Sequence, residues 1–126
     1  EFKSLTVLKG REIIMKKIEA YIRPEKLNMT QDALKEAGCE CITISEVKGH
    51  GHQKGVSEVW KGKKFNVDLL PKVKLEIVVA DEELDVTVQT IIEVSQTGSI
   101  GDGKIFVYDV MNAYRVRTGE QGDTAV

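Results

Sequence analysis

The chain has 126 residues, of which 41% are hydrophobic and 30% are charged, and its formal net charge is −2. This length suits one domain with a single core, and the composition is that of an ordinary globular protein. The near-neutral charge gives no support to a nucleic-acid-binding role, and no apolar run reaches the length of a membrane span or a signal-peptide core.

The first half of the chain is predicted to form a strand, a helix and a second strand. Residues 1–14 are set aside as an N-terminal extension or a cloning remnant, which leaves one domain over residues 15–126. Apolar and polar residues alternate in MKKIEAYI, which predicts a strand. Pro24 is expected to open a helix that ends at Gly38, and the β-branched alternation of CECITISEV predicts the second strand.

A long polar stretch, KGHGHQKGVSEVWKGKKF from Lys48 to Phe65, comes next and shows no sustained periodicity. At about eighteen residues it exceeds an ordinary hairpin loop, and long loops in compact domains are usually functional or disordered. Trp60 and Phe65 have no expected core partner, which favours a binding role for this loop over a simple solvated connection.

The second half repeats the same order of elements. VDLLPKVKLEIVVA predicts a third strand, and DEELDVTVQTIIEVSQTG predicts a helix with Asp81 as its N-cap and Gly98 as its stop. KIFVYDV predicts a fourth strand and YRVRT a short fifth one. The order β-α-β, long loop, β-α-β predicts an α+β ferredoxin-like fold, in which two helices cover one face of a four-stranded antiparallel sheet. Apolar residues such as Tyr21, Phe106 and Tyr108 are expected on the other face, which implies self-association.

Two cysteines, Cys39 and Cys41, are separated by one residue and are poorly placed to bridge each other. They are expected to be small core or strand-face residues, and the lack of a disulfide framework fits a reducing cytoplasm. With His50 and His52 they could also form a zinc set, although the spacing is not that of a zinc finger.

Within the segment TGSIGDGKI, Thr97–Ile105, the residues Gly98, Gly103 and Lys104 fit the first seven positions of the phosphate loop G-x-x-x-x-G-K-[ST]. It is not a P-loop, because it follows a helix and precedes a strand, and because Ile105 lacks the hydroxyl that contacts magnesium. Its glycines can still form a backbone anion-binding nest beside Lys104. Arg115 and Arg117, two apart on the expected fifth strand, would point two guanidinium groups to one side. Both a polyphosphate site and a tight turn with a solvated basic edge fit these residues.

Residues 15–126 resemble the PII nitrogen-regulatory signal transducers almost without gaps. The most specific part of the resemblance is TGSIGDGKIFVYDV, and EVKGHGHQKG, DLLPKVKLEIVV and YRVRTGE match at the expected places. The resemblance implies a cytoplasmic homotrimer of ferredoxin-like subunits with ATP or ADP in the clefts between them. It also implies a T-loop, about residues 48–67, that docks onto an ammonium transporter or an enzyme of nitrogen assimilation. It implies no catalytic residue and no nucleic-acid partner, and it places the protein at a membrane only through a transporter.

Residue by residue, the resemblance assigns three sets. The residues implied for the nucleotide are Thr43, Gly49, Gly51, His52, Gln53, Glu76, Gly101, Asp102, Gly103, Lys104, Arg115 and Arg117. Those implied for 2-oxoglutarate are Gln53, Lys54, Gly55, Lys72 and Gly101. Those implied for docking onto targets are Trp60 and Phe65.

The resemblance also gives each group of these residues a role. The turn that ends at Lys104 would cradle the phosphates, and the two arginines would reach them. Thr43 and Glu76 would help hold the nucleoside. Lys72 would pair with a carboxylate of 2-oxoglutarate, and Gln53 would help hold the Mg²⁺ that bridges 2-oxoglutarate to ATP.

Several positions depart from the family pattern. Phe65 stands where the family often has a modifiable tyrosine, so uridylylation there is expected to be absent. Lys63 stands where some relatives carry a phosphorylated serine, and Trp60 replaces a second common tyrosine. His52 replaces an arginine near the phosphates, and its shorter, mostly neutral imidazole is expected to alter ATP affinity or the discrimination between ATP and ADP.

Two other classes of function are weighed against this prediction. A slow nucleotide phosphohydrolase could use the same intersubunit cleft, but the sequence offers no nucleophile paired with a base. An RNA-binding module could use the open face of the sheet, but the alternating aromatic pattern of such modules is missing.

Overall fold

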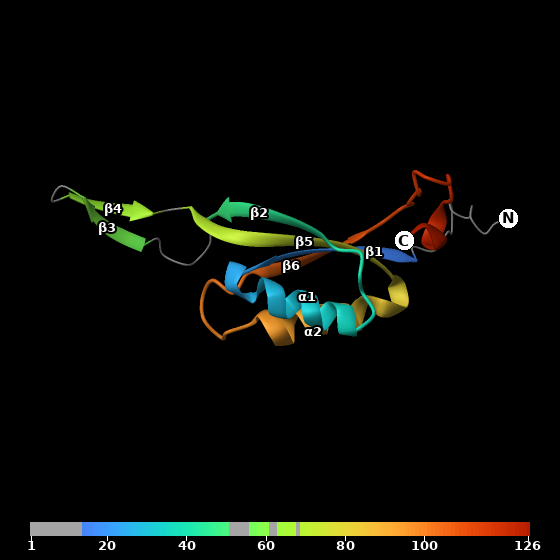
Figure 1. Ribbon diagram of the computed structural model, residues 1–126, viewed down its shortest axis with the longest axis horizontal. Helices are drawn as coiled ribbons and strands as arrows, with labels where there is room; N and C mark the ends of the chain where they lie inside the picture. Colours follow the sequence, from blue (N-terminus) through green and yellow to red (C-terminus); the bar gives the residue numbers. More distant parts are fainter. Residues whose placement is uncertain (1–13, 51–55, 61–62, 68) are drawn as a thin grey trace.

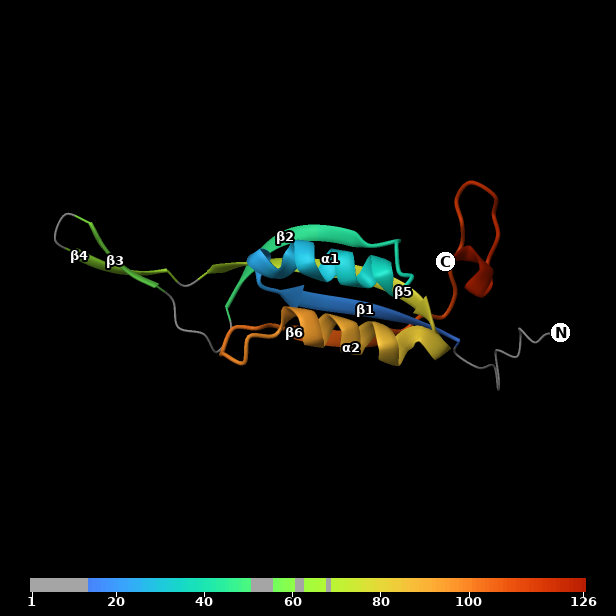
Figure 2. The ribbon, with the colours of Figure 1, turned by 60° about the horizontal axis from the view of Figure 1, so that its bottom comes forward.

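The computed structural model describes residues 14–50, 56–60, 63–67 and 69–126. Its elements in chain order are β1 (Met15–Ile22), η2 (Pro24–Lys26), α1 (Leu27–Glu36), β2 (Thr43–Gly49), β3 (Val56–Trp60), β4 (Lys63–Val67), β5 (Leu70–Ala80), η3 (Asp81–Glu83), α2 (Leu84–Ser95), β6 (Lys104–Asp109) and η4 (Gly122–Ala125). Four strands form an antiparallel sheet in the order β2-β5-β1-β6. Both α1 and α2 cover one face of this sheet (Figure 1, Figure 2). The predicted ferredoxin-like fold is confirmed.

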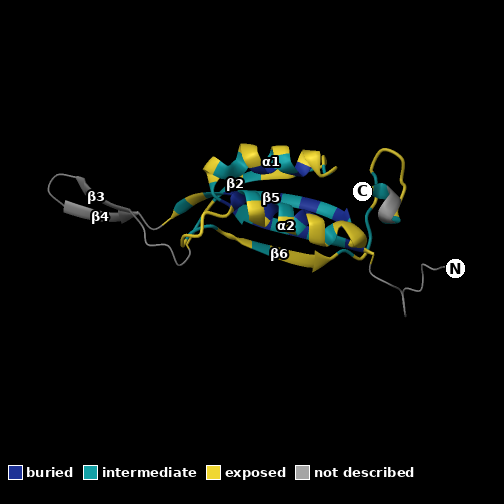
Figure 3. Ribbon diagram, turned by 90° about the horizontal axis from the view of Figure 1, so that it is seen from below, coloured by how far each residue is buried: buried dark blue, intermediate teal, exposed yellow. Residues whose placement is uncertain are grey.

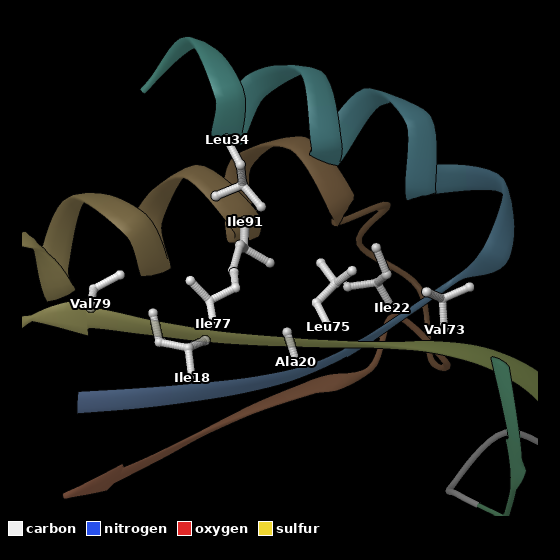
Figure 4. Close-up of a cluster of buried hydrophobic side chains, with 9 residues drawn as sticks. All are labelled: Ile18, Ala20, Ile22, Leu34, Val73, Leu75, Ile77, Val79 and Ile91. Carbon is white, nitrogen blue, oxygen red and sulfur yellow. The ribbon is translucent and has the colours of Figure 1, made fainter. Parts of the chain in front are cut away.

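The hydrophobic core lies between that face of the sheet and the two helices (Figure 4). Successive side chains of a strand point to opposite faces, so alternate residues of β1 and β5 are buried. The buried cluster consists of Ile18, Ala20, Ile22, Leu34, Val73, Leu75, Ile77, Val79 and Ile91. Burying each larger side chain contributes about 1.5–3 kcal/mol, and this packing holds the sheet in place. Seen from the side of the helices, buried stretches of β5 lie between α1 and α2 (Figure 3). The other face of the sheet has no layer over it within the described chain (Figure 1).

The end of α1 follows the prediction. Gly38 has a left-handed φ of 94°, and its N–H donates to the carbonyl of Lys35 at 3.0 Å. The next N–H, that of Cys39, donates to the carbonyl of Leu34 at 2.9 Å. These two bonds are those of a Schellman motif, which satisfies carbonyls at the helix end and turns the chain away.

Three predicted boundaries are wrong. The second strand begins at Thr43 and not at Cys39, because Cys39 is still held by the end of α1. Asp81 is not the N-cap of the second helix. A 3-10 turn comes first, and the Asp81 carboxylate pairs with the Lys16 ammonium at 3.1 Å. That helix ends at Ser95, before Gly98.

The predicted fifth strand, YRVRT, is also wrong. Tyr114 makes one isolated bridge to Gln121, and the residues after it form a turn. The N–H of Gly119 donates to the carbonyl of Arg115 at 2.7 Å, which closes that turn. The alternation in YRVRT lacks a neighbouring strand that could pair with all of it.

The long polar stretch from Lys48 to Phe65 contains more regular structure than predicted. β3 and β4 pair antiparallel as a separate two-stranded ribbon, with Val56 opposite Val67. This ribbon lies beyond the ends of β2 and β5, away from the main sheet (Figure 1, Figure 2). Trp60 is the last residue of β3. None of the helices in the described residues has the length and apolar character needed to cross a membrane.

Candidate functional site

The turn between α2 and β6 is built around the carboxylate of Asp102. This carboxylate accepts hydrogen bonds from the N–H of Thr97 at 2.7 Å, the hydroxyl of Thr97 at 2.5 Å and the N–H of Gly98 at 2.8 Å. These bonds close residues 97–102 into a compact turn. The Asp102 side chain therefore shapes the turn from within.

Arg23 and Lys72 fasten this turn to the rest of the domain. The Arg23 guanidinium donates to the Asp102 carboxylate at 3.0 Å and to the carbonyl of Ile100 at 2.9 Å. The Lys72 ammonium donates to the carbonyl of Gly101. Burial is the main cause that lowers the pKa of Lys72, and the charge of Arg23 adds to it. The hydrogen bonds from Thr97, with a smaller one from Arg23, hold the pKa of the Asp102 carboxyl well below its usual value.

Gly103 brings the turn against β1. Its φ is 107°, and a Cβ at this position would overlap the carbonyl oxygen of Tyr21. Only glycine combines this left-handed backbone with so close an approach. The next residue, Lys104, starts β6 opposite Tyr21 and has an exposed side chain. The turn therefore ends with an exposed ammonium on the open face of the sheet.

Charged residues on the open face pair within the chain. Thr43 of β2 lies directly opposite Glu76 of β5, the two residues implied for the nucleoside. The Lys17 ammonium contacts the Glu76 carboxylate at 2.9 Å, and this hydrogen bond lowers the pKa of Glu76. The Lys74 ammonium lies 3.5 Å from the Glu19 carboxylate. These charges on β1 and β5 are thus largely balanced inside one subunit.

Aromatic residues occupy the same face, as predicted. The Tyr21 and Phe106 rings meet edge to face with their centroids 6.2 Å apart. The Tyr108 hydroxyl donates to the Glu19 carboxylate at 2.8 Å, which raises the pKa of Tyr108. Phe106 and Tyr108 remain 46% and 48% exposed. An apolar surface with balanced charges is therefore open to a partner.

The two arginines lie in the turn that follows Tyr114. The N–H of Arg115 donates to the carbonyl of Glu120 at 2.8 Å, and its guanidinium lies 3.5 Å from the Glu120 carboxylate. Arg117 is exposed. The C-terminal segment lies at the opposite end of the sheet from the 97–103 turn (Figure 1, Figure 2). The length of β6 separates the two, roughly 17–20 Å for a strand of this size.

One subunit therefore does not bring the predicted site residues together. Lys72 and the turn from Gly101 to Lys104 lie at one end of the sheet. Thr43 is on β2, which is one edge strand of the sheet, whereas β6 is the other edge strand. Three strand spacings, about 14 Å, separate these two edges. Within a single chain the arginines do not lie beside the glycine-rich turn. The prediction that both guanidinium groups point to one side assumed a fifth strand, and that strand does not form.

Two of the remaining predicted residues lie in described strands. Gly49 is the last residue of β2 and pairs with Leu70, and Phe65 is in β4, opposite Glu58. The other five lie outside the described residues: Gly51, His52, Gln53, Lys54 and Gly55.

The cysteines are both free thiols, with Cys39 half-buried and Cys41 exposed. Burial raises the pKa of the Cys39 thiol. Over the described ranges, no group of three or more His, Cys, Asp or Glu side chains is arranged to hold a metal ion. The alternative zinc set also includes His52, which lies outside those ranges.

Sequence reasoning missed Arg23 and the inward role of Thr97. Arg23 is separated from Asp102 by 79 positions, and no periodicity links them. The threonine offered a weak signal, because Thr and Asp side chains near glycines commonly bond to the local backbone.

The sequence of the chain matches a model of the family described as nitrogen regulatory protein P-II over residues 15–120. The chain belongs to the P-II family. Nitrogen regulatory protein P-II 1 of Escherichia coli is 54% identical over 112 residues, which cover 89% of this chain and 100% of that protein. P-II 2 of Methanothermobacter thermautotrophicus is 53% identical over 114 residues, which cover 90% of this chain and 99% of that one.

A solved structure agrees with this assignment. Arabidopsis thaliana PII bound to citrate matches with a TM-score of 0.74 and 38% identity, over 91% of this chain and 94% of that one. The curated relatives are named regulatory proteins, so this P-II protein is a signal transducer in nitrogen regulation and not an enzyme. This favours the predicted signalling role over the phosphohydrolase alternative.

Alanine substitution at two glycines of the turn separates backbone strain from close packing. Gly98→Ala places a side chain in open space at a φ of 88°, and should cost about 1–2 kcal/mol of unfolding free energy. Gly103→Ala adds a collision with the β1 backbone, and should cost roughly 2–5 kcal/mol. Urea unfolding of both variants measures the difference. Equal losses would contradict the close approach to Tyr21.

Asp102→Asn should lower stability near neutral pH and have progressively less effect in acid. The folded-state pKa of Asp102 lies below that of the unfolded chain. Its carboxylate therefore stabilises the fold fully above pH about 4, and this contribution is lost as the pH falls toward the folded-state pKa. The thermal midpoints of wild type and variant should differ by a constant amount between pH 7 and about pH 4, and the difference should shrink as the pH is lowered further, to pH 2. Glu93→Gln, on the exposed side of α2, is the control and should shift the midpoint little at pH 7. A gap for Asp102→Asn that does not shrink between pH 4 and pH 2 would contradict the role of the carboxylate.

Proposed function

We propose that this P-II protein is a cytoplasmic homotrimer that binds ATP or ADP between subunits and 2-oxoglutarate with Mg²⁺ nearby. In this proposal the ligands set the conformation of the T-loop, about residues 48–67, and targets read that conformation. Each ligand shifts the loop only by its differential affinity for the alternative conformations. The targets we propose are an ammonium transporter or an enzyme of nitrogen assimilation.

The observation that carries the proposal is the division of the nucleotide residues between two ends of the sheet. The turn from Gly101 to Lys104 offers glycine N–H groups and an ammonium, both suited to phosphate. Arg115 and Arg117 are suited to the same phosphates, but the C-terminal segment that contains them lies at the other end of the subunit (Figure 1). A second copy that placed its arginines beside the first copy's turn would complete the site.

The open face of the sheet supports such an assembly. Its ion pairs, Lys17 with Glu76 and Lys74 with Glu19, form within one chain, so a partner does not have to supply countercharges. Its aromatic residues, Phe106 and Tyr108, are about half exposed in the isolated subunit. A closed trimer would bury this face in three equivalent interfaces.

Lys72 supports coupling between nucleotide and 2-oxoglutarate. Its ammonium already contacts the carbonyl of Gly101 in the turn that we assign to the phosphates. A dicarboxylate that recruits Lys72 would therefore act directly on the nucleotide turn. Gln53 would help hold the Mg²⁺ between the two ligands, and Lys54 and Gly55 would contact 2-oxoglutarate.

We assign docking onto targets to the loop that contains the β3–β4 ribbon, which lies away from the main sheet (Figure 1). Trp60 and Phe65 are the proposed anchors, because aromatic residues dominate interface energetics. With Phe65 and Lys63 at the positions of modified residues in relatives, uridylylation and serine phosphorylation there have no hydroxyl to act on. Regulation would rest on the ligands, with His52 adjusting the preference for ATP or ADP.

Calorimetry tests this proposal. ATP should bind the wild-type protein, and 2-oxoglutarate should bind tightly only when ATP and Mg²⁺ are present. Lys104→Gln should weaken ATP about 10- to 100-fold, because it removes a charge-assisted bond to phosphate. Lys35→Gln, which removes an exposed ammonium from α1, is the matched control and should bind ATP like the wild type.

Two results count against the proposal. Binding of 2-oxoglutarate that is independent of ATP would defeat the coupled mechanism. Wild-type ATP affinity in Lys104→Gln, with the same stoichiometry, would remove the turn from the nucleotide site.

A further inference from the structure

Asn112, three residues after the end of β6, sits at the base of the C-terminal hairpin that carries Arg115 and Arg117. Its side-chain oxygen accepts hydrogen bonds from the N–H of Ala113 at 2.9 Å and the N–H of Gly122 at 3.0 Å. Its side-chain nitrogen donates to the Gln121 side chain at 3.1 Å. One amide side chain thus ties the start of the hairpin to its end.

Little else in the described chain fixes this hairpin through packing. Tyr114 is 65% exposed and Val116 is fully exposed, so neither contributes to a core within the subunit. The ladder has one isolated bridge, supported by backbone bonds such as that from Gly122 to the carbonyl of Ala113 at 3.0 Å. Even a two-stranded hairpin is marginal by itself in water, and this segment has a single bridge. Its conformation therefore depends strongly on the polar bonds at its base.

We propose that Asn112 is a positioning residue for nucleotide phosphates. By closing the hairpin, it fixes the direction in which Arg115 and Arg117 project from the subunit before any ligand binds. Guanidinium groups that are already aimed lose less conformational freedom on binding, so the phosphates bind more tightly. The inference rests on the proposed function, since it assumes that these arginines reach the phosphates.

The bonding pattern predicts which substitutions at position 112 are tolerated. Asn112→Ala removes both acceptor bonds and both donor bonds, the latter to Gln121 at 3.1 Å and to the Tyr114 hydroxyl at 3.4 Å. Asn112→Asp keeps an oxygen for the N–H groups of Ala113 and Gly122, and the Gln121 amide can turn to donate to it. Alanine should therefore loosen the hairpin, and aspartate should restore most of it.

Hydrogen exchange measures the hairpin without any ligand. In Asn112→Ala the amides of Arg115, Gly119 and Gly122 should exchange at least several-fold faster than in the wild type, because their bonds close the hairpin. Asn112→Asp should return them close to wild-type rates. Asn28→Ala, the same change on the exposed side of α1, is the control and should leave them unchanged.

Calorimetry with ATP then tests positioning in the same 126-residue chain. Asn112→Ala should weaken ATP roughly five- to tenfold, with the thermal midpoint of the domain little changed, and Asn112→Asp should recover most of the affinity. In an Arg115→Gln/Arg117→Gln background, adding Asn112→Ala should have almost no further effect. A residue that acts through the arginines loses its effect when they are gone, whereas an independent structural effect persists.

The outcomes separate failure of this inference from failure of the proposed function. Unchanged exchange in Asn112→Ala, or unchanged ATP affinity despite faster exchange, overturns the positioning role. The positioning role is also overturned if Asn112→Ala weakens ATP binding as much in the Arg115→Gln/Arg117→Gln background as in the wild type. If the wild type binds no ATP, the proposed function falls and the positioning role falls with it, while the exchange rates still report whether Asn112 closes the hairpin.

Discussion

The carboxylate of Asp102 is the interaction on which the candidate site depends. It gathers the backbone and hydroxyl of Thr97, the N–H of Gly98 and the guanidinium of Arg23, so one side chain both closes the turn and ties it to the end of β1. This carboxylate is bonded inside the turn and to Arg23, and the charged side chain exposed at the end of the turn is the Lys104 ammonium. An acidic residue in the turn is thereby compatible with the anionic ligand that we propose for it.

Sheet geometry explains why the proposed nucleotide residues do not meet in one subunit. β6 carries the chain from Lys104, at one end of the sheet, to the segment that holds Arg115 and Arg117, at the other end (Figure 1). The same open face presents exposed aromatic residues and ion pairs that are satisfied internally. Both features are explained by association with a neighbouring copy. That copy would cover the exposed aromatic surface, and its residues would complete the proposed nucleotide site.

The sequence predicted the parts of this structure that depend on local periodicity. Alternating residues around Ile18 predicted β1 because burial alternates along a strand, and Gly38 predicted the end of α1 because that position requires a left-handed backbone. The sequence did not predict contacts between residues that are far apart along the chain. Asp81 pairs with Lys16 of β1 instead of capping its helix, and no neighbouring strand pairs with the alternating residues around Arg115. Family motifs supplied the site residues, but not the fact that they are divided between two ends of a subunit.

A complementation experiment tests the central claim, that two copies build one nucleotide site. Lys104→Gln removes the ammonium of the turn, and Arg115→Gln/Arg117→Gln removes the guanidinium groups, so each variant should bind ATP poorly by itself. When the two are unfolded together and refolded as mixed assemblies, some interfaces should combine an intact turn from one chain with intact arginines from the other. The account predicts that near-wild-type ATP affinity returns at a reduced number of sites. No recovery in assemblies shown by mass spectrometry to be mixed would contradict it.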